Sequence, residues 1–260
     1  MPADRTRARL FDREAERYDR ARPGYPDELI AEVLGPSPEG LSVLDVACGT
    51  GIASRAMAQR GANVHAVELN PAMAAIAQRH GIPTQVAAFE TWEPAERTFD
   101  RVTCAQAWHW LDPEVSIRKI ASLLRPGGRV CLFWNVGRHP DDLAAALRDA
   151  YERALPAGGA GLTVGYSTNG RKDLTLDFGA ITGVLAACDA LDAPRTHSFP
   201  WSRTYSRAQW LDELLSHSDH TALPPDVRQP LFDAIGATID RFGGSFEMSY
   251  VAVLISASRR

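Results

Sequence analysis

Short apolar runs that alternate with stretches of helical periodicity are the feature that most constrains the fold of this chain. From residue 42 to residue 134 the apolar runs predict strands, and most of them are followed by a turn and a helix. Parallel strands need crossovers of this length, so the alternation predicts an α/β fold with helices on both faces of the sheet. These strands are predicted over residues 42–46, 64–69, 84–89, 100–107 and 129–134.

The two ends of the chain are less regular. Residues 9–21 predict a helix, and Asp27 predicts the cap of a second helix that ends near Gly35. The glycine-rich residues 156–172 predict a mobile loop. Further helices are predicted over 52–60, 71–80, 113–124, 141–155, 181–191, 209–217 and 225–242, with a break near Pro230 in the last, and further strands over 197–204 and 247–256.

The composition excludes several classes of protein. Hydrophobic residues make up 45% and charged residues 23% of the 260 residues, which is the balance of a globular chain that can bury a core. A net charge of −4 provides no basic field for nucleic acid. No apolar run reaches the roughly 18 residues of a membrane span, and the N-terminus lacks the apolar segment of a signal peptide. We therefore expect a cytoplasmic protein with no nucleic-acid partner and no membrane partner.

The residues that could bind a metal ion are poorly arranged for it. The four cysteines form no C-x-x-C pair, so they are better read as buried apolar filler than as zinc ligands. His217, Asp219 and His220 lie close together, but they follow a predicted helix end, where polar residues serve as caps. We expect no metal site.

The turn after the first predicted strand carries the strongest signal of function. It reads Val-Leu-Asp-Val-Ala-Cys-Gly-Thr-Gly over residues 43–51 and leads from a buried strand into a helix. Gly49 and Gly51 allow a ligand to approach the backbone, and the helix beyond them presents free N–H groups and a positive dipole end. In open α/β sheets the ligand crevice lies at such a turn.

Two cofactors compete for this turn. A dinucleotide site favours G-x-G-x-x-G/A, but Ser54 stands where the last small residue is expected. Asp45 is also foreign to a dinucleotide strand and fits a ligand with a cationic amino-acid end. Glu68 closes the next strand, where an acid can accept both hydroxyls of a ribose. An NAD-dependent oxidoreductase is therefore the least favoured function.

These residues resemble motif I of the class I S-adenosylmethionine-dependent methyltransferases, whose common form is V-L-D-x-G-x-G-x-G. Similar landmarks follow in the same order, and the chain also resembles the small-molecule branch of that family, in particular the trans-aconitate methyltransferase-like group. The likeness extends over about residues 8–135 and is looser beyond. The segments that carry it are Phe-Asp-x-x-Ala-x-x-Tyr at 11–18, Arg-Pro-x-Tyr-Pro at 22–26, Val-Glu-Leu-Asn at 67–70, Ala-Phe-Glu at 88–90, Phe-Asp at 99–100, Gln-Ala-Trp-His-Trp at 106–110, Leu-Arg-Pro-Gly-Gly at 124–128 and Phe-Trp-Asn at 133–135.

The resemblance implies a Rossmann-like class I methyltransferase fold with a seven-stranded mixed sheet. The last strand is then expected to enter antiparallel between the fifth and sixth strands. With no long polar linker in the sequence, we expect one domain over residues 1–260. Its parts would be N-terminal lid helices at 8–35, a cofactor-binding core at 41–135, substrate-side insertions at 136–245 and a final strand at 246–258.

The resemblance also implies a set of cofactor contacts. Asp45 and the turn after it would surround the amino-acid part of the cofactor, Glu68 would hold the ribose hydroxyls, and Gln106 would lie near the sulfonium. Tyr18 and Arg22 would close over the cofactor, with Arg22 paired to its carboxylate. The full implied set is Tyr18, Arg22, Asp45, Ala47, Gly49, Gly51, Glu68, Asn70, Met73, Phe89, Glu90 and Gln106.

One residue of this set departs from the family pattern. Ala47 replaces the first glycine of motif I. A methyl group there is a small intrusion, and we expect it to be tolerated with a slightly displaced methionine moiety.

The acceptor site is expected beyond the fourth strand. Alternation would place Trp108 and Trp110 on one face and His109 on the other, and Tyr25 and Trp134 would complete the wall. His109 is the candidate general base, since an imidazole titrates near neutral pH. The opposing interpretation is that both tryptophans anchor the next helix and that His109 is a packing residue.

The function implied is methyl transfer from S-adenosylmethionine to the O, N or C atom of a small molecule, such as a carboxylate or a specialised metabolite, with S-adenosylhomocysteine as product. The sulfonium is already a strong electrophile, so the protein would mainly align the reactants and exclude water. Two alternatives stay open: a protein of the same fold that uses the cofactor for other catalysis, and a non-catalytic binding partner. A monomer and a homodimer are equally compatible with the sequence.

Overall fold

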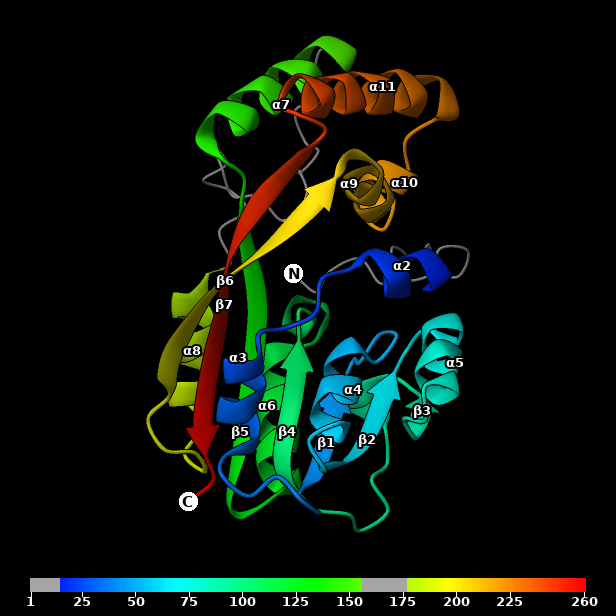
Figure 1. Cartoon of the computed structure of the whole chain (residues 1–260). Helices are drawn as coiled ribbons and strands as arrows, with labels where there is room; N and C mark the ends of the chain where they lie inside the picture. The colour runs from blue at the N-terminus through cyan, green and yellow to red at the C-terminus, as the bar shows by residue number, and fades with distance from the viewer. Residues whose placement is uncertain (1–14, 156–176) are drawn as a thin grey trace.

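A central sheet of seven strands organises the molecule, seen in a computed structural model that describes residues 15–155 and 177–260 (Figure 1). The strands are β1 (Ser42–Val46), β2 (Asn63–Glu68), β3 (Thr84–Val86), β4 (Phe99–Ala105), β5 (Leu124–Arg138), β6 (Arg195–Ser206) and β7 (Ser245–Ser258). Their order is β3-β2-β1-β4-β5-β7-β6. The first five pair in parallel, whereas β7 is antiparallel to both β5 and β6. This topology confirms the mixed α/β sheet and the expected place of the last strand.

Helices cover both faces of the sheet. On one face α3 and α4 bury apolar residues against β1, β5 and β7, and on the other α6 and α8 pack with β4 and β5. The helices are α2 (Ala15–Ala21), α3 (Asp27–Leu34), α4 (Ile52–Ala58), α5 (Pro71–Arg79), α6 (Pro113–Leu123), α7 (Asp141–Ala154), α8 (Phe178–Ala186), α9 (Arg207–Leu214), α10 (Ser218–Thr221) and α11 (Pro225–Arg241), with the 3₁₀ turns η2 (Phe89–Thr91) and η3 (Trp108–Trp110). Among the described residues no helix has the length and apolarity of a membrane span.

A helical cap stands beyond the carboxyl ends of β1, β2 and β4. Strands β5, β6 and β7 extend past the other strands and carry α7, α9 and α11, which share a core around Trp210, Tyr205 and Leu231 (Figure 1). Helix α2 lies between this cap and the carboxyl ends of the parallel strands (Figure 1). The edge of the sheet at which a ligand crevice is expected therefore faces α2, with the cap beyond it.

Two predicted boundaries near the site were wrong. Strand β3 ends at Val86 instead of running to Phe89, because the chain turns into η2 and buries the Phe89 ring beside Trp92. Asp27 is the first helical residue and not the cap; Pro26 takes the cap position in an extended conformation. The Asp27 carboxylate lies in the first turn of α3, where the helix dipole favours negative charge.

Larger differences lie in the second half of the chain. The helix predicted over 181–191 is α8, which ends at Ala186, and β5 is longer at both ends than the predicted 129–134. Helix α11 is not broken, although Pro230 removes one backbone donor. The residues that follow Pro230, from Leu231 to Ile239, bury their apolar side chains in the core shared with α7 and α9. The predicted mobile loop at 156–172 and residues 9–14 of the first predicted helix lie outside the described residues.

Candidate active site

A cavity opens at the carboxyl ends of β1, β2 and β4, beside α2, at the edge where the sequence predicts a ligand. Most of the predicted site residues, which come from segments far apart in the chain, meet there. Those that line the cavity are Tyr18, Arg22, Tyr25, Ala47, Gly49, Glu68, Asn70, Met73, Phe89, Glu90, Gln106 and Trp110.

Asp45 lies behind the cavity wall. Its side chain is fully buried in β1 and is not among the lining residues. Oδ2 accepts a 2.5 Å hydrogen bond from the Ser54 hydroxyl in α4, and Oδ1 accepts one of 2.8 Å from the Thr103 hydroxyl in β4. Burial raises the pKa of Asp45 to about 6, against the two hydrogen bonds, which favour the carboxylate. Asp45 therefore ties three elements together around the turn that it precedes.

Backbone conformation explains the glycine-rich turn. Ala47 has φ +53, Gly49 has φ +60 and Gly51 has φ +84, so all three occupy the left-handed region. A Cβ at position 51 would lie 3.2 Å from the Ala77 Cβ in α5. Both this packing and the left-handed backbone therefore disfavour any residue other than glycine at this position. Gly51 itself does not line the cavity, and its role is to shape the turn. Ala47 carries the strain that glycine avoids in the common motif.

Glu68 presents an acid at the end of β2. Its Oε2 accepts the Gly49 N–H at 2.8 Å, and its Oε1 accepts the Asn70 N–H at 2.8 Å. Burial raises the pKa of Glu68 from its usual value, although these backbone donors oppose the rise. The carboxylate thus fixes the turn on one side while it borders the cavity on the other.

The wall beyond Glu68 is amphipathic. Asn70 caps α5 by accepting the Met73 N–H at 3.0 Å, and Met73 and Phe89 bring buried apolar surface to the cavity. Glu90 Oε1 accepts the Asp112 N–H at 3.2 Å, which joins η2 to the start of α6. This wall therefore offers apolar surface bordered by polar groups that can orient a ligand.

Gln106 and Asn135 form the floor between β4 and β5. Gln106 follows β4 directly with φ +57, and its Nε2 donates to the Asn135 carbonyl at 3.3 Å. Asn135 also lines the cavity, where its Nδ2 donates to the Gly24 carbonyl at 2.8 Å and its Oδ1 accepts the Trp201 Nε1–H at 3.1 Å. Sequence reasoning missed Asn135. The available signal was strand alternation, because Trp134 and Asn135 point to opposite faces of β5.

Helix α2 and the residue that follows it bring Tyr18 and Arg22 to the cavity. The Arg22 guanidinium lies 4.7 Å from the centre of the Tyr18 ring, and its Nη2 donates to the Ser216 carbonyl at 3.0 Å. The next residue of α2, Asp19, accepts hydrogen bonds of 2.8 and 3.2 Å from Arg55 in α4 and lies 2.9 Å from His80 Nε2 after α5. The helix therefore bridges the parallel sheet and the cap.

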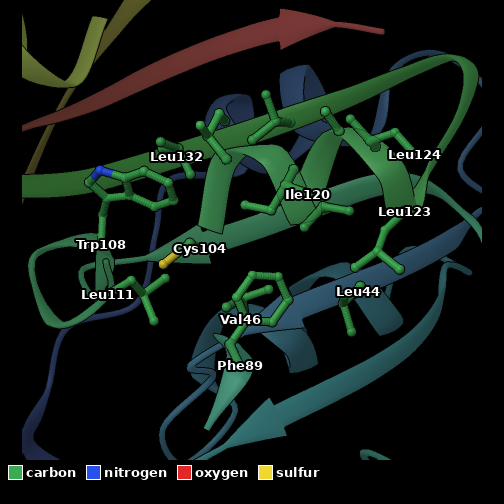
Figure 2. Packing of buried hydrophobic residues seen from close by; sticks show 14 of the residues in the cluster. Leu44, Val46, Phe89, Cys104, Trp108, Leu111, Ile120, Leu123, Leu124 and Leu132 are labelled. Carbon is green, nitrogen blue, oxygen red and sulfur yellow. The ribbon is translucent and has the colours of Figure 1, made fainter. Parts of the chain in front are cut away.

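Three residues predicted for the acceptor site do not line the cavity. Trp108 is buried in the core with Cys104, Leu111 and Leu132, as Figure 2 shows. His109 is exposed, with its ring 4.9 Å from that of Trp110. The chain forms the 3₁₀ turn η3 here, so the strand alternation used to place the three side chains does not apply.

Trp134 is likewise enclosed in the core. Its side chain is 1% exposed, and its ring meets Phe178 edge-on at 5.6 Å. Of the predicted acceptor-side aromatic residues, the structure thus brings only Tyr25 and Trp110 to the cavity wall.

The polar cluster after α9 is held by hydrogen bonds. His217 Nε2 lies 2.9 Å from Glu213 Oε1, and His220 lies between Asp219, at 2.8 Å, and the Tyr151 hydroxyl, at 2.7 Å. Within residues 15–155 and 177–260 no group of three His, Cys, Asp or Glu side chains is placed to hold a metal ion. These side chains join α7, α9 and α10 within the cap.

Comparison with known proteins identifies the segment that builds this site. Residues 43–128 match the family model of the methyltransferase domain. An uncharacterized methyltransferase of Mycobacterium tuberculosis is 40% identical over 121 residues, which are 45% of this chain and 49% of that protein. A ubiquinone biosynthesis O-methyltransferase of Alkalilimnicola ehrlichii is 29% identical over 171 residues, 56% of this chain and 68% of that protein. The chain thus spans about half the length of the mycobacterial relative.

The fold is shared more widely than the sequence. A solved structure from Anaeromyxobacter dehalogenans, provisionally described as a type II methyltransferase, superposes with a TM-score of 0.61 at 22% identity. The match covers 90% of this chain and 97% of that one. The fold is therefore the Rossmann-like fold of class I methyltransferases, as the sequence motifs indicate.

Proposed function

Residues 43–128 belong to the methyltransferase domain family, and from this premise we propose that the protein transfers the methyl group of S-adenosylmethionine to a small-molecule acceptor. The observation that carries the proposal is the junction of Glu68 with the turn after β1. There a buried carboxylate faces the cavity while it holds the backbone of Gly49 and Asn70.

The charges of the cavity fit this cofactor. Among the described lining residues Glu68 and Glu90 are the only acids, and Arg22 is the only lysine or arginine. Glu68 is suited to the ribose hydroxyls, and Arg22 to the carboxylate of the methionine part. We assign the ribose and adenine contacts to Asn70, Met73, Phe89 and Glu90, and the methionine contacts to Tyr18, Ala47 and Gly49.

Asp45 and Gly51 receive an indirect role in this proposal. Neither lines the cavity, and both fix the turn that carries Ala47 and Gly49. The same reasoning excludes Trp108, His109 and Trp134 from direct contact with either ligand.

The acceptor is proposed to bind among Tyr25, Gln106, Trp110 and Asn135. When bound, S-adenosylmethionine supplies an electrophilic methyl group, and the residues of this wall orient the nucleophile and exclude water. No histidine occurs among the described residues that line the cavity. We therefore infer that the acceptor reacts through alignment, and we propose the Tyr18 and Tyr25 hydroxyls of the cavity lining as candidates for proton transfer.

Calorimetric titration with S-adenosylhomocysteine, S-adenosylmethionine and NAD tests the proposal. We expect micromolar binding of both sulfur compounds, no binding of NAD, and loss of binding in Glu68→Gln. Glu114→Gln is the matched control, since Glu114 is an exposed acid of α6 away from the cavity. Binding of NAD alone would show that the site is a dinucleotide site.

A screen of acceptors then separates catalysis from mere binding. The wild-type protein is incubated with labelled S-adenosylmethionine and small acids, phenols and amines, and methylated product is measured. Product formation supports an enzyme. If the cofactor binds but no methyl group reaches any acceptor, the protein is a binding partner or uses the cofactor for other catalysis.

A further inference from the structure

A buried acid outside the cavity controls the arginine inside it. Glu213 of α9 is fully buried and does not line the cavity, yet its Oε1 lies 4.0 Å from Arg22 Nη1. The side chain of Arg22 is itself only 8% exposed. A carboxylate and a guanidinium removed from water at this separation compensate each other's charge.

Glu213 also contacts His217, and this contact helps to fix the charge state of its carboxyl group. His217 Nε2 lies 2.9 Å from the same Oε1, while Oε2 has no hydrogen-bond partner among the described residues. Burial alone would raise the pKa of Glu213, but His217 and Arg22 together hold that pKa below its usual value. The group is therefore a carboxylate at neutral pH, and Arg22 is its nearby guanidinium counter-charge.

Arg22 is fixed from three sides. Its Nη2 donates to the Ser216 carbonyl, its guanidinium lies over the Tyr18 ring, and Glu213 attracts its other terminal nitrogen. A long, flexible side chain thereby loses its rotamer freedom before any ligand arrives, which lowers the entropy cost of binding.

We propose that Glu213 is a positioning residue that holds the Arg22 guanidinium at the cavity wall to receive the carboxylate of the cofactor's methionine part. The inference rests on the proposed function, because it takes the cofactor to carry that carboxylate. Glu213 also offsets the positive charge of Arg22, which would otherwise repel the ammonium and sulfonium groups of the same ligand. The acid thus acts on ligand binding without touching the ligand.

Two ligands that differ in the carboxylate test this inference. S-Adenosylhomocysteine has the amino-acid tail, and 5′-methylthioadenosine lacks it but keeps the thioether, ribose and adenine. In Glu213→Gln we expect the affinity for S-adenosylhomocysteine to fall about tenfold, a typical size for coupled buried neighbours, and the affinity for methylthioadenosine to stay within about twofold. A structural role alone would weaken both ligands equally.

A double-mutant cycle with Arg22→Gln gives the second readout. If Glu213 acts through Arg22, Glu213→Gln causes no further loss of S-adenosylhomocysteine affinity once Arg22 is replaced. Asp240→Asn is the matched control, because Asp240 is an acid of α11 that pairs with Arg207 at the start of α9 and does not line the cavity. That control should leave the ratio of the two affinities unchanged.

Each outcome has a distinct meaning. If the wild-type protein binds neither ligand, the proposed function fails. If the wild-type protein binds both ligands but Glu213→Gln weakens them equally, changes neither, or tightens S-adenosylhomocysteine, the positioning role is overturned and the cofactor assignment stands. Should Glu213→Gln not fold, Glu213→Asp keeps the charge and withdraws it by one methylene group, and a smaller loss, still confined to S-adenosylhomocysteine, is expected.

Discussion

The Ser54 hydroxyl donates a 2.5 Å hydrogen bond to Asp45 Oδ2 and so joins the first turn of α4 to β1 directly beneath the glycine-rich turn. Ser54 is the residue that breaks the dinucleotide pattern, and Asp45 is the acid that a dinucleotide strand would lack. The two departures are thus one structural feature. Asp45 works through this bond and that from Thr103, not by contact with the cavity.

The buried charge of Asp45 predicts a pH-dependent stability. Burial raises its pKa in the folded state to about 6, while an unfolded aspartate titrates near about 3.9. Between these values the folded state binds more protons, so the contribution of Asp45 to the free energy of unfolding falls as the pH rises. Asp45→Asn removes this contribution. The stability of the variant relative to wild type should therefore increase by up to about 3 kcal/mol from about pH 4 to about pH 7. Urea unfolding across this range measures it, and a difference that does not vary with pH would contradict the argument.

Replacement of Asp45 by alanine should abolish cofactor binding. The Ser54 and Thr103 hydroxyls then lose their buried acceptor, at about 1–3 kcal/mol for each unsatisfied group, and the turn that carries Ala47 and Gly49 is released. We expect no measurable titration with S-adenosylhomocysteine. Asp100→Asn is the control, because Asp100 is an acid of β4 that pairs with Arg125 away from the cavity. Unchanged affinity in Asp45→Ala would remove the basis for the motif I assignment.

The sequence predicted the parts of the site that depend on order along the chain. Strand–turn–helix spacing placed Gly49 and Glu68, and the family resemblance placed Gln106, at the edge of the sheet where the structure has them, because parallel strands bring their carboxyl ends together whatever the packing. It failed at the acceptor side. Whether Trp108, Trp134 or Asn135 faces the cavity depends on a 3₁₀ turn and on the register of β5.

Contacts between segments that are distant in the chain could not be predicted from the sequence either. Nothing near Arg22 in the chain indicates Glu213, and nothing near Asp45 indicates Thr103. These pairs arise only when α2 docks on α9 and when β4 pairs with β1, so they are properties of the packed fold.

We predict that Ala47→Gly stabilises the folded protein. A non-glycine residue in the left-handed region is strained by about 1–2 kcal/mol, whereas glycine adds about 0.4–1 kcal/mol of unfolded-state entropy. Ala47→Gly should therefore raise the free energy of unfolding by up to about 1 kcal/mol. Ala47→Val should lower it, since a β-branched side chain fits this conformation poorly. Thermal and urea unfolding of the two variants measure these changes in the free energy of unfolding. A loss of stability in Ala47→Gly would show that the left-handed conformation of Ala47 is only weakly strained.

We predict that the contacts of Asp19 slow the release of the cofactor. The Asp19 carboxylate, in a side chain that is 16% exposed, joins α2 to Arg55 and His80. Asp19→Asn should weaken this attachment by about 1 kcal/mol and accelerate dissociation of S-adenosylhomocysteine by several-fold, with a smaller change in the association rate. Stopped-flow displacement measures both rates. Asp27→Asn is the control, because the Asp27 carboxylate is 86% exposed and pairs with Arg60 away from the cavity. Equal dissociation rates for wild type and Asp19→Asn would show that α2 does not gate the site.

We predict that substitution of Asn135 weakens acceptor binding much more than cofactor binding. Its side chain joins Gly24, before α3, to Trp201 of β6, and its carbonyl holds the Gln106 amide at the floor of the cavity. Asn135→Leu keeps the size and the backbone carbonyl that accepts from Gln106, but it leaves the Gly24 carbonyl and the Trp201 Nε1–H without their partner. The KM for the acceptor should therefore rise about tenfold or more, while S-adenosylhomocysteine affinity changes less than about threefold. Trp201→Phe removes only the donor to Asn135 and retains an aromatic ring to stack on Tyr250, whose ring centre lies 4.6 Å from that of Trp201, so it should show a weaker form of the same effect. Steady-state kinetics with the acceptor found by screening, together with calorimetry, provide both quantities. A parallel loss of cofactor affinity in Asn135→Leu would place Asn135 in the cofactor site instead.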